Sequence, residues 1–231
     1  RRVRQAFYQA IDEATIRNKV MRGFATPTGL LVGPGINGFD PDLNKRLSFD
    51  PAAAKTLLAE AGYPKGFSVG MDCPNDRYLN DEAICDSIVA MLGKIGVKLR
   101  LNAQTRSKFF AKLMDPNNGS SFYLLGWQPQ TYDALDTLVN LAATPNKDAY
   151  RGDANFGGYS NAQLDALITR IAGETDPAKR LDLIHRALAI VKDDIAYIPL
   201  HQQDLVWAAR SNIELVQQGD GMFPLRYVQI R

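Results

Sequence analysis

Between Phe67 and Trp127, segments with the character of strands alternate with segments whose apolar residues recur at helical spacing. The expected elements are strands at 67–72, 97–102 and 122–127 and helices at 80–95 and 105–114. Strands and helices that alternate in this way imply right-handed crossovers and a largely parallel sheet. This region therefore predicts an α/β fold.

A short helix with clear start and stop signals precedes this region. Asp50 is a good N-cap, because its carboxylate can accept a hydrogen bond from a free amide of the first turn. Pro51 suits the first helical position, where no amide proton is needed. Gly62 can adopt the left-handed conformation that ends a helix, and Pro64 prevents the helix from resuming. We therefore expect a helix from residue 51 to residue 61.

The rest of the chain predicts mainly helices, with extended segments near the C-terminus. Ser160 is expected to cap a helix that ends at Ile171, and Asp176 to cap a long helix that ends near Val191. The long helix carries one apolar stripe, formed by Leu181, Ile184, Leu188 and Val191. The other expected elements are helical segments at 3–21, with a break near 12–15, and at 133–143, a loop at 26–47, and extended segments at 195–201 and 205–209.

The composition of the 231 residues argues against several classes of function. Hydrophobic residues make up 45% and charged residues 23%, as in a soluble globular protein, and the length allows one substantial core or one and a half domains. The formal net charge of +2 offers no basic excess for binding nucleic acid or an anionic membrane surface. No apolar run approaches the roughly 18 residues of a membrane span, and the sequence shows no signal peptide.

Five segments, in a fixed order, carry a resemblance to a known family. Residues 49–67 read FDPAAAKTLLAEAGYPKGF, and Gly126-Trp127 closes an apolar strand. The other segments are 3–23, 75–101 and 159–200. Together they resemble the C-terminal lobe of the peptide/nickel-type solute-binding proteins of ABC importers, bacterial extracellular solute-binding family 5. The resemblance covers nearly the whole chain.

The resemblance implies a fold, a function and a location. Residues 1–194 are expected to form a periplasmic-binding-protein type II-like lobe, and residues 195–231 a tail that crosses the hinge toward a first lobe. The function is the capture of a small solute or short peptide between two lobes and its delivery to an ABC permease in the inner membrane, without catalysis or a cofactor. We interpret the chain as a C-terminal fragment of a periplasmic protein whose precursor carries a signal peptide. Tail strands that lack the first lobe are expected to pair with another copy of the fragment.

Two cysteines, Cys73 and Cys85, are present. Cys73 follows the first expected strand and Cys85 lies early on the next helix, and such positions can lie within disulfide reach. A bridge is reasonable in an exported protein. The alternative is two separate buried thiols, and the spacing leaves both open.

The loop after the expected third strand is the first candidate for a solute site. Ligands of open α/β sheets bind beyond the carboxyl ends of the strands. Trp127 would supply contact area and one directed N–H group there, although it could instead pack under the loop. The candidate ligand-binding residues of this loop are Trp127, Gln128, Gln130, Tyr132 and Asp133.

Gln130 marks a departure from the family pattern. In peptide-binding members, an aspartate three residues beyond the tryptophan pairs with the α-ammonium group of the peptide, and that position here is Gln130. A neutral amide cannot replace the charge-assisted hydrogen bond of a carboxylate. Asp133 either pairs with the ammonium instead or caps the following helix. Solutes without a free amino terminus, such as opines or sugars, therefore stay open.

A second candidate, Arg77-Tyr78, lies in the loop after the first expected strand. In a parallel sheet this loop lies at the same end as Trp127. Arg77 could bind a carboxylate and Tyr78 could stack on a solute. The alternative is a solvated arginine next to Asn80 as a helix cap.

Other chemistry finds little support in the sequence. Residues 33–38 match the pattern GxGxxG, but no helix follows in register and Pro34 removes an amide. The two histidines, His185 and His201, and the two cysteines make a poor metal set. The alternative functions are an α/β hydrolytic enzyme that uses a carboxylate such as Asp133, and an interaction or signalling module that does not serve transport.

Overall fold

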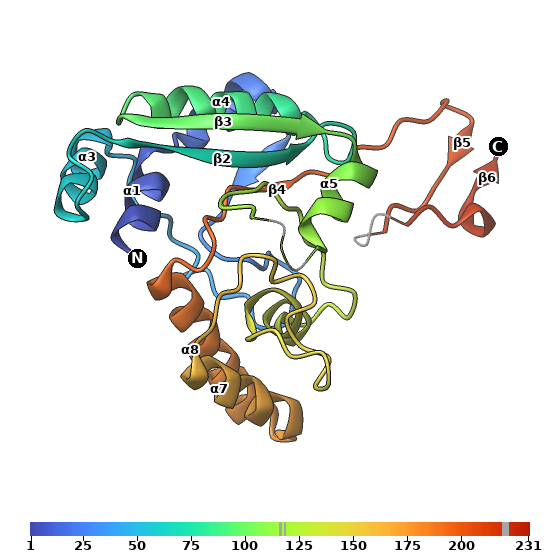
Figure 1. Ribbon diagram of the computed structural model, residues 1–231. Helices are drawn as coiled ribbons and strands as arrows, with labels where there is room; N and C mark the ends of the chain where they lie inside the picture. The colour runs from blue at the N-terminus through green and yellow to red at the C-terminus, as the bar shows by residue number, and fades with distance from the viewer. Residues whose placement is uncertain (116, 118, 219–221) are drawn as a thin grey trace.

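Two parallel strands, joined by a helix, form the centre of one half of the molecule. The computed structural model describes residues 1–115, 117, 119–218 and 222–231. Strands β2 (Phe67–Pro74) and β3 (Val97–Gln104) pair along their full lengths, and helix α4 (Asp81–Gly93) connects them (Figure 1). The buried side of α4 presents Ile84, Cys85, Ile88, Met91 and Leu92 to a hydrophobic core that it shares with both strands.

Helices α1 (Arg2–Ala10) and α3 (Pro51–Glu60) complete this first core. The start and stop signals of α3 are confirmed. The Asp50 carboxylate accepts a hydrogen bond from the amide of Ala53 at 2.9 Å, and Gly62 has a φ of +92°, the left-handed conformation that ends the helix. This helix depends on residues within one turn of each end, which explains why it could be predicted.

The third strand expected at 122–127 is reduced to one bridge. Tyr123 pairs in parallel with Asp72, whose amide donates to the carbonyl of Phe122 at 2.8 Å and whose carbonyl accepts from the amide of Leu124 at 3.1 Å. The chain therefore runs beside β2 in the expected direction, but the strand prediction is wrong, because pairing with β2 is limited to this single bridge. The α/β class is confirmed.

A second hydrophobic core lies below the strand pair in Figure 1 and is built mainly from helices. Its elements are α6 (Ala134–Thr137), the π-helix η2 (Leu138–Ala142), α7 (Ala162–Gly173) and α8 (Pro177–Asp194). Helices expected at 133–143 and from Asp176 are thus confirmed.

Two details of these helices differ from the sequence prediction. Asn161, not Ser160, caps α7: its side-chain oxygen accepts from the amides of Gln163 and Leu164. The Ser160 hydroxyl is instead hydrogen-bonded to that of Thr144 at 2.8 Å. On α8, Leu181 is 38% exposed. The buried face of α8 comprises Leu183, Ile184, Ala187, Leu188 and Val191.

The N-terminal segment and the start of the tail form a small antiparallel pair. The break expected near residue 12 separates α1 from α2 (Glu13–Thr15), which continues into the π-helix η1 (Ile16–Val20). Strand β1 (Ala25–Pro27), in a region expected to be a loop, pairs with β4 (His201–Gln203). Helix α5 (Arg106–Leu113) follows β3 as expected.

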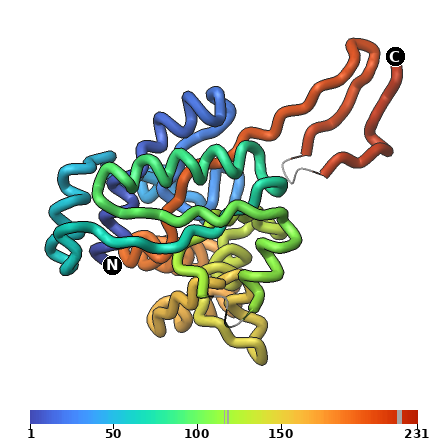
Figure 2. The backbone as a smooth tube through the Cα atoms, turned by 45° about the horizontal axis from the view of Figure 1, so that its top comes forward, coloured from blue at the N-terminus to red at the C-terminus, as the bar shows by residue number. Residues whose placement is uncertain are grey.

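The C-terminal part of the chain extends away from both cores (Figure 2). It contains β5 (Ile213–Glu214), the 3-10 helix η3 (Leu225–Tyr227) and β6 (Gln229–Ile230), and β5 pairs with β6 in antiparallel fashion. Residues 205–209, expected to be extended, belong to no strand. The hairpin leaves many large apolar side chains exposed, among them Leu225 and Ile230.

Cys73 and Cys85 are joined by a disulfide, with their Cα atoms 6.6 Å apart. The bridge links the end of β2 to the second turn of α4, and both residues are fully buried. Within the described part of the chain, no helix has the length and apolar character needed to cross a membrane.

Candidate functional site

The loop that carries Arg77 and Tyr78 leaves the carboxyl end of β2 and is tied to the start of α4. One oxygen of the Asp81 carboxylate accepts from the backbone amides of Arg77 and Tyr78, at 2.9 and 3.0 Å. Asp81 is only 3% exposed, so these bonds are sheltered from water. Asn80, expected as the cap, makes no capping hydrogen bond and donates instead to the carbonyl of Val20. Asn80 thus stands at the start of α4, but its side chain does not cap the helix, contrary to the alternative interpretation of this loop.

Tyr78 reaches from this loop to Gly126, directly before Trp127. Its hydroxyl donates to the carbonyl of Gly126 at 3.3 Å. The ring lies so close that a Cβ atom on residue 126 would stand 2.7 Å from it. The guanidinium of Arg77 lies 5.0 Å from the centre of the same ring, a cation–π distance. The structure thus brings Arg77, Tyr78 and the loop of Trp127 together at one end of the strand pair.

Trp127 is half-buried, and its indole nitrogen is shielded from solvent without an acceptor among the described residues. The side-chain nitrogen of Gln104, the last residue of β3, is in the same state. A buried donor without a partner costs about 1–3 kcal/mol, so an incoming acceptor would relieve that cost. Gln104 was not identified from the sequence as a candidate site residue. Its place just after the expected strand at 97–102, where ligands of α/β sheets bind, could have indicated it.

The other loop residues predicted to bind a solute lie at the surface. Gln130 donates from its backbone amide to Asp136 and from its side chain to the carbonyl of Gln128, both at 3.3 Å. Tyr132 is 44% exposed and has a φ of +54°, and its carbonyl accepts from the amide of Asn37 at 2.9 Å. These hydrogen bonds hold the backbone of the loop in a defined conformation.

The carboxylate of Asp133 has a structural role, and its oxygens are not open to a solute. Arg180 of α8 binds both of its oxygens, at 2.7 and 2.9 Å, Asn37 donates to one of them, and the amide of Leu135 to the other. Burial alone would raise the pKa of Asp133, but hydrogen bonds from Arg180 and Asn37 lower it overall. Of the two roles considered for Asp133, it caps the following helix. Because four donors occupy its oxygens, no acceptor position is left for a solute ammonium.

A second buried carboxylate, absent from the sequence predictions, supports the segment that leads to Trp127. Asp72 is 3% exposed and accepts from Lys112 at 2.7 and 2.8 Å, from Asn102 at 2.8 Å and from Ser120 at 2.6 Å. Burial would raise the pKa of Asp72, yet these hydrogen bonds lower it overall. Since Asp72 also pairs with Tyr123, the network fixes where this segment meets β2.

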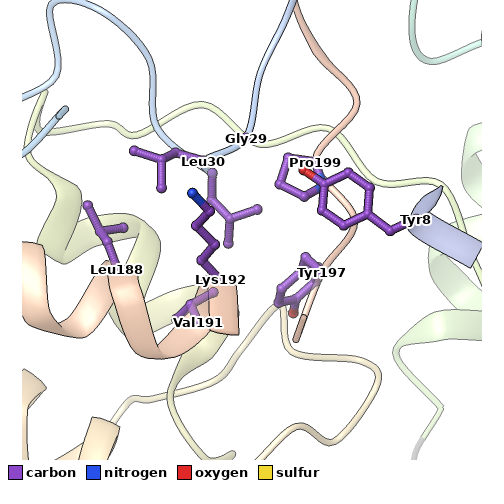
Figure 3. A pocket seen from close by; sticks show the side chains of 9 residues that line it. Tyr8, Gly29, Leu30, Leu188, Val191, Lys192, Tyr197 and Pro199 are labelled. Atoms are coloured by element: carbon purple, nitrogen blue, oxygen red, sulfur yellow. The ribbon is translucent and has the colours of Figure 1, made fainter. Parts of the chain in front are cut away.

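Two hollows in the surface lie away from these residues. The first, between α1, α8 and the start of the tail, has a volume of about 10 Å³, close to that of one water site (Figure 3). It is lined mainly by apolar side chains, and its size excludes a solute. The second is an open depression between α7 and α8. Neither of these two hollows is lined by Trp127, Arg77 or Tyr78.

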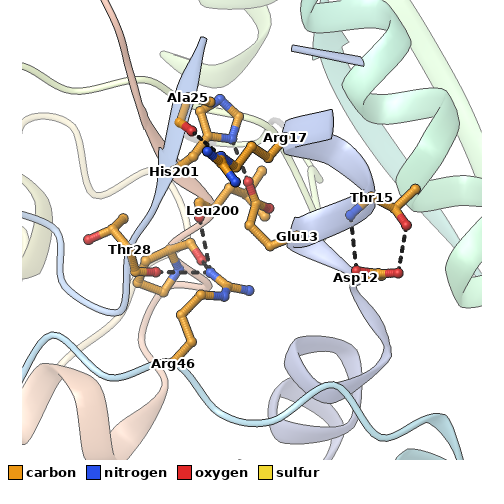
Figure 4. Close-up of polar contacts among 10 residues, drawn as sticks. Asp12, Glu13, Thr15, Arg17, Ala25, Thr28, Arg46, Leu200 and His201 are labelled. Atoms are coloured by element: carbon orange, nitrogen blue, oxygen red, sulfur yellow. Dashed lines mark hydrogen bonds and ion pairs between the residues drawn. The ribbon is translucent and has the colours of Figure 1, made fainter. Parts of the chain in front are cut away.

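His201 forms a buried pair near the start of the tail. His201 lies 2.8 Å from the Glu13 carboxylate, and both side chains are buried (Figure 4). Beside them, Arg46 donates to the carbonyls of Thr28, Pro199 and Leu200, and so anchors the point where the tail leaves the lobe. In residues 1–115, 117, 119–218 and 222–231, no group of three or more His, Cys, Asp or Glu side chains could hold a metal ion.

The chain matches known proteins in sequence. A family model described as "Bacterial extracellular solute-binding proteins, family 5 Middle" matches residues 1–149. Curated relatives include the glutathione-binding protein GsiB of Escherichia coli strain K12, 27% identical over 215 residues, and that of Salmonella typhimurium strain LT2, 28% identical over 218 residues. Each match covers 92% of this chain and 41% of the relative. The chain therefore spans less than half the length of these relatives.

Solved structures match in fold over the whole chain. HbpA2 from Haemophilus parasuis has a TM-score of 0.82 at 24% identity, over 45% of its own length. MoaA from A. tumefaciens R10, in complex with mannopinic acid, has a TM-score of 0.82 at 24% identity, over 46% of its length. NikA from Staphylococcus aureus, in complex with Ni(L-His)2, has a TM-score of 0.81 at 20% identity, over 48% of its length.

Proposed function

Because the chain belongs to the bacterial extracellular solute-binding proteins of family 5, we propose that it is one lobe of a protein that captures a small solute between two lobes and delivers it to an ABC permease. Its fold is that of a type II periplasmic-binding-protein lobe. The observation that carries the proposal is the match of the family over residues 1–149, which includes the strand pair and its loops. In this proposal residues 1–194 form the lobe, and residues 195–231 lead from it toward the first lobe, on which the part of the tail after β4 packs.

The solute would bind at the edge formed by Arg77, Trp127 and Gln104. Arg77 offers a guanidinium that can bind a carboxylate through two hydrogen bonds. Trp127 and Gln104 offer buried N–H groups that lack acceptors. Donors of this kind favour a small solute rich in oxygen acceptors, with at least one carboxylate. Gln130 in place of a carboxylate, and the saturated Asp133, disfavour recognition of a free ammonium group.

A binding role is favoured over catalysis. The hydrolytic alternative required a carboxylate such as Asp133 to exchange protons, but that side chain accepts four hydrogen bonds and has a lowered pKa. We place the protein outside the cytoplasm, in the periplasm, where a disulfide such as Cys73–Cys85 persists. A signal peptide on the precursor would accord with this placement.

Calorimetry on two forms of the protein tests the proposal. The longer form contains this chain together with the residues that precede it in its gene, and the probes are glutathione and mannopinic acid. We expect the longer form to bind at least one probe, and the 231-residue chain to bind it weakly or not at all, because closure of two lobes is needed to desolvate the solute. Tight binding by the 231-residue chain alone would contradict the two-lobe mechanism.

Substitutions in the longer form test the location of the site. Arg77→Ala should weaken binding of a carboxylate-bearing probe about tenfold or more, the effect of losing a hydrogen-bonded charge. Trp127→Phe should weaken it as well, because the indole N–H is lost. The matched control is Arg170→Ala on α7, which should leave affinity unchanged. Unaltered binding in both site variants would remove this edge as the solute site.

A further inference from the structure

We propose that Tyr78 is a positioning residue for Trp127, and that the Cys73–Cys85 disulfide holds Tyr78 in that position. The relevance of this arrangement to the solute rests on the proposed function, whereas the arrangement itself rests on contacts within the chain. It would make the covalent bond between β2 and α4 responsible for the geometry of an aromatic side chain in another loop.

Tyr78 contacts Gly126 directly. The two residues are 48 positions apart in sequence, yet the Tyr78 hydroxyl donates to the Gly126 carbonyl at 3.3 Å. A Cβ atom at residue 126 would lie 2.7 Å from the ring, so the ring occupies the space that any other residue would need. Trp127 is bonded directly to the residue that Tyr78 holds. The position of the Tyr78 ring therefore limits where the Trp127 backbone can lie.

The backbone hydrogen bonds to β2 do not reach residue 126. The backbone bonds between this segment and β2 involve Phe122 and Leu124. On the other side, the next buried residue is Pro129. Gly126 itself is exposed. Tyr78 thus supplies a side-chain restraint in the interval where the ladder bonds have ended.

The position of Tyr78 depends on the conformation of its own loop, residues 75–80. Residues 75–77, 79 and 80 are all exposed, so apolar packing does little to hold them. Hydrogen bonds hold the loop instead. The amides of Arg77 and Tyr78 donate to Asp81. Further hydrogen bonds join Asn75 to Gln104, Asp76 to Arg106 and Asn80 to Val20. The disulfide is the covalent restraint among them. Cys73 and Cys85 flank the loop and Asp81, and both are fully buried. The disulfide thus ties β2 to α4 across this loop, and in the proposal it helps to hold Asp81 and Tyr78 in place.

Fluorescence of Trp127 provides a direct test that needs no solute. The chain contains two tryptophans, so Trp207→Phe leaves Trp127 as the sole emitter. In this background we compare Tyr78→Ala, Tyr78→Phe, the double variant C73A/C85A, and Tyr150→Ala as a matched control at a highly exposed tyrosine. The readouts are the emission maximum and the acrylamide quenching constant, with circular dichroism to verify folding.

We expect Tyr78→Ala to shift Trp127 emission to longer wavelength and to raise its quenching constant. Tyr78→Phe keeps the ring and should stay close to the parent, and Tyr150→Ala should equal it. C73A/C85A should change emission in the same direction as Tyr78→Ala, and combining the two should add little, because both act through one path. A folded Tyr78→Ala protein with unchanged Trp127 emission would overturn the proposal, even if C73A/C85A failed to fold. Unchanged emission in a folded C73A/C85A protein would overturn the role of the disulfide.

The same variants separate this inference from the proposed function. In the longer form, Tyr78→Ala is titrated with glutathione and mannopinic acid. Altered Trp127 fluorescence with unchanged affinity for a probe that binds the parent would support the positioning role and contradict Trp127 as a solute contact. Altered fluorescence together with lost affinity would support both.

Discussion

At the residue scale, the position of a carboxylate in the sequence did not reveal its role. Asp133 lies in the loop where a solute ligand was expected, but Arg180, 47 residues away, binds both of its oxygens. The two side chains are about one-fifth exposed, so the pair is sheltered enough to influence stability. Its lowered pKa means that the folded state favours the ionised form.

Asp133→Asn tests this role. A lowered carboxyl pKa contributes stability that is present above the pKa of the unfolded chain and lost as the pH falls through the folded value. We expect the variant to lower the free energy of unfolding by about 1.5–3 kcal/mol at pH 7, the range for hydrogen bonds to charged groups. The loss should shrink as the pH falls below the unfolded carboxyl pKa. Urea titrations at neutral and acidic pH measure both effects.

Asp182→Asn is the control for this experiment, because Asp182 forms an exposed pair with Arg186. Such surface pairs contribute little. A D133N protein as stable as D182N at pH 7 would show that the Arg180 pair is unimportant.

At the element scale, local signals predicted where helices begin more reliably than where strands exist. Helix α3 follows its cap, its proline and its terminal glycine. The third strand did not form, although its residues were suited to one, because a strand requires a partner along its length and β2 offers only the single bridge at Asp72. The predicted start of α7 was wrong by one residue, because the hydroxyl of Ser160 is hydrogen-bonded to that of Thr144 and does not cap the helix.

The cap of α7 gives a prediction at this scale. Asn161→Ala removes the acceptor for two first-turn amides and should destabilise the protein by about 0.5–2 kcal/mol. Ser160→Ala, next to it, removes no capping bond and should cost less. Thermal unfolding of both variants measures the difference. Equal losses, or a larger loss for Ser160→Ala, would contradict Asn161 as the cap.

At the scale of the whole molecule, two cores and an extended tail divide the chain. Arg46 and the Glu13–His201 pair anchor the tail where it leaves the lobe. Beyond this point several of its large apolar side chains are exposed, among them Leu225 at 75% and Ile230 at 78%. Exposed apolar surface of this kind marks an interaction site, in agreement with the proposal that the tail packs on a first lobe.

The tail gives a prediction about assembly. We expect the 231-residue chain to self-associate reversibly as its concentration rises, because the exposed apolar residues and the edges of the β5–β6 hairpin find partners in another copy. Leu225→Lys with Ile230→Lys should reduce this association, whereas Leu181→Lys on α8 should not. The longer form should be monomeric. Light scattering after size-exclusion chromatography measures the masses, and a strictly monomeric 231-residue chain would refute the prediction.

The sequence by itself determined the α/β class, the capped helix α3 and the family. It also placed one cysteine after the first strand and the other early on the next helix. These follow from signals that act within a few residues or from order along the chain. Only the tertiary structure decided that Asp133 binds Arg180, that Tyr78 covers Gly126 and that Lys112 neutralises Asp72, because each contact joins residues at least 40 positions apart. Pairing at such distances depends on how the elements pack, which local propensity does not encode.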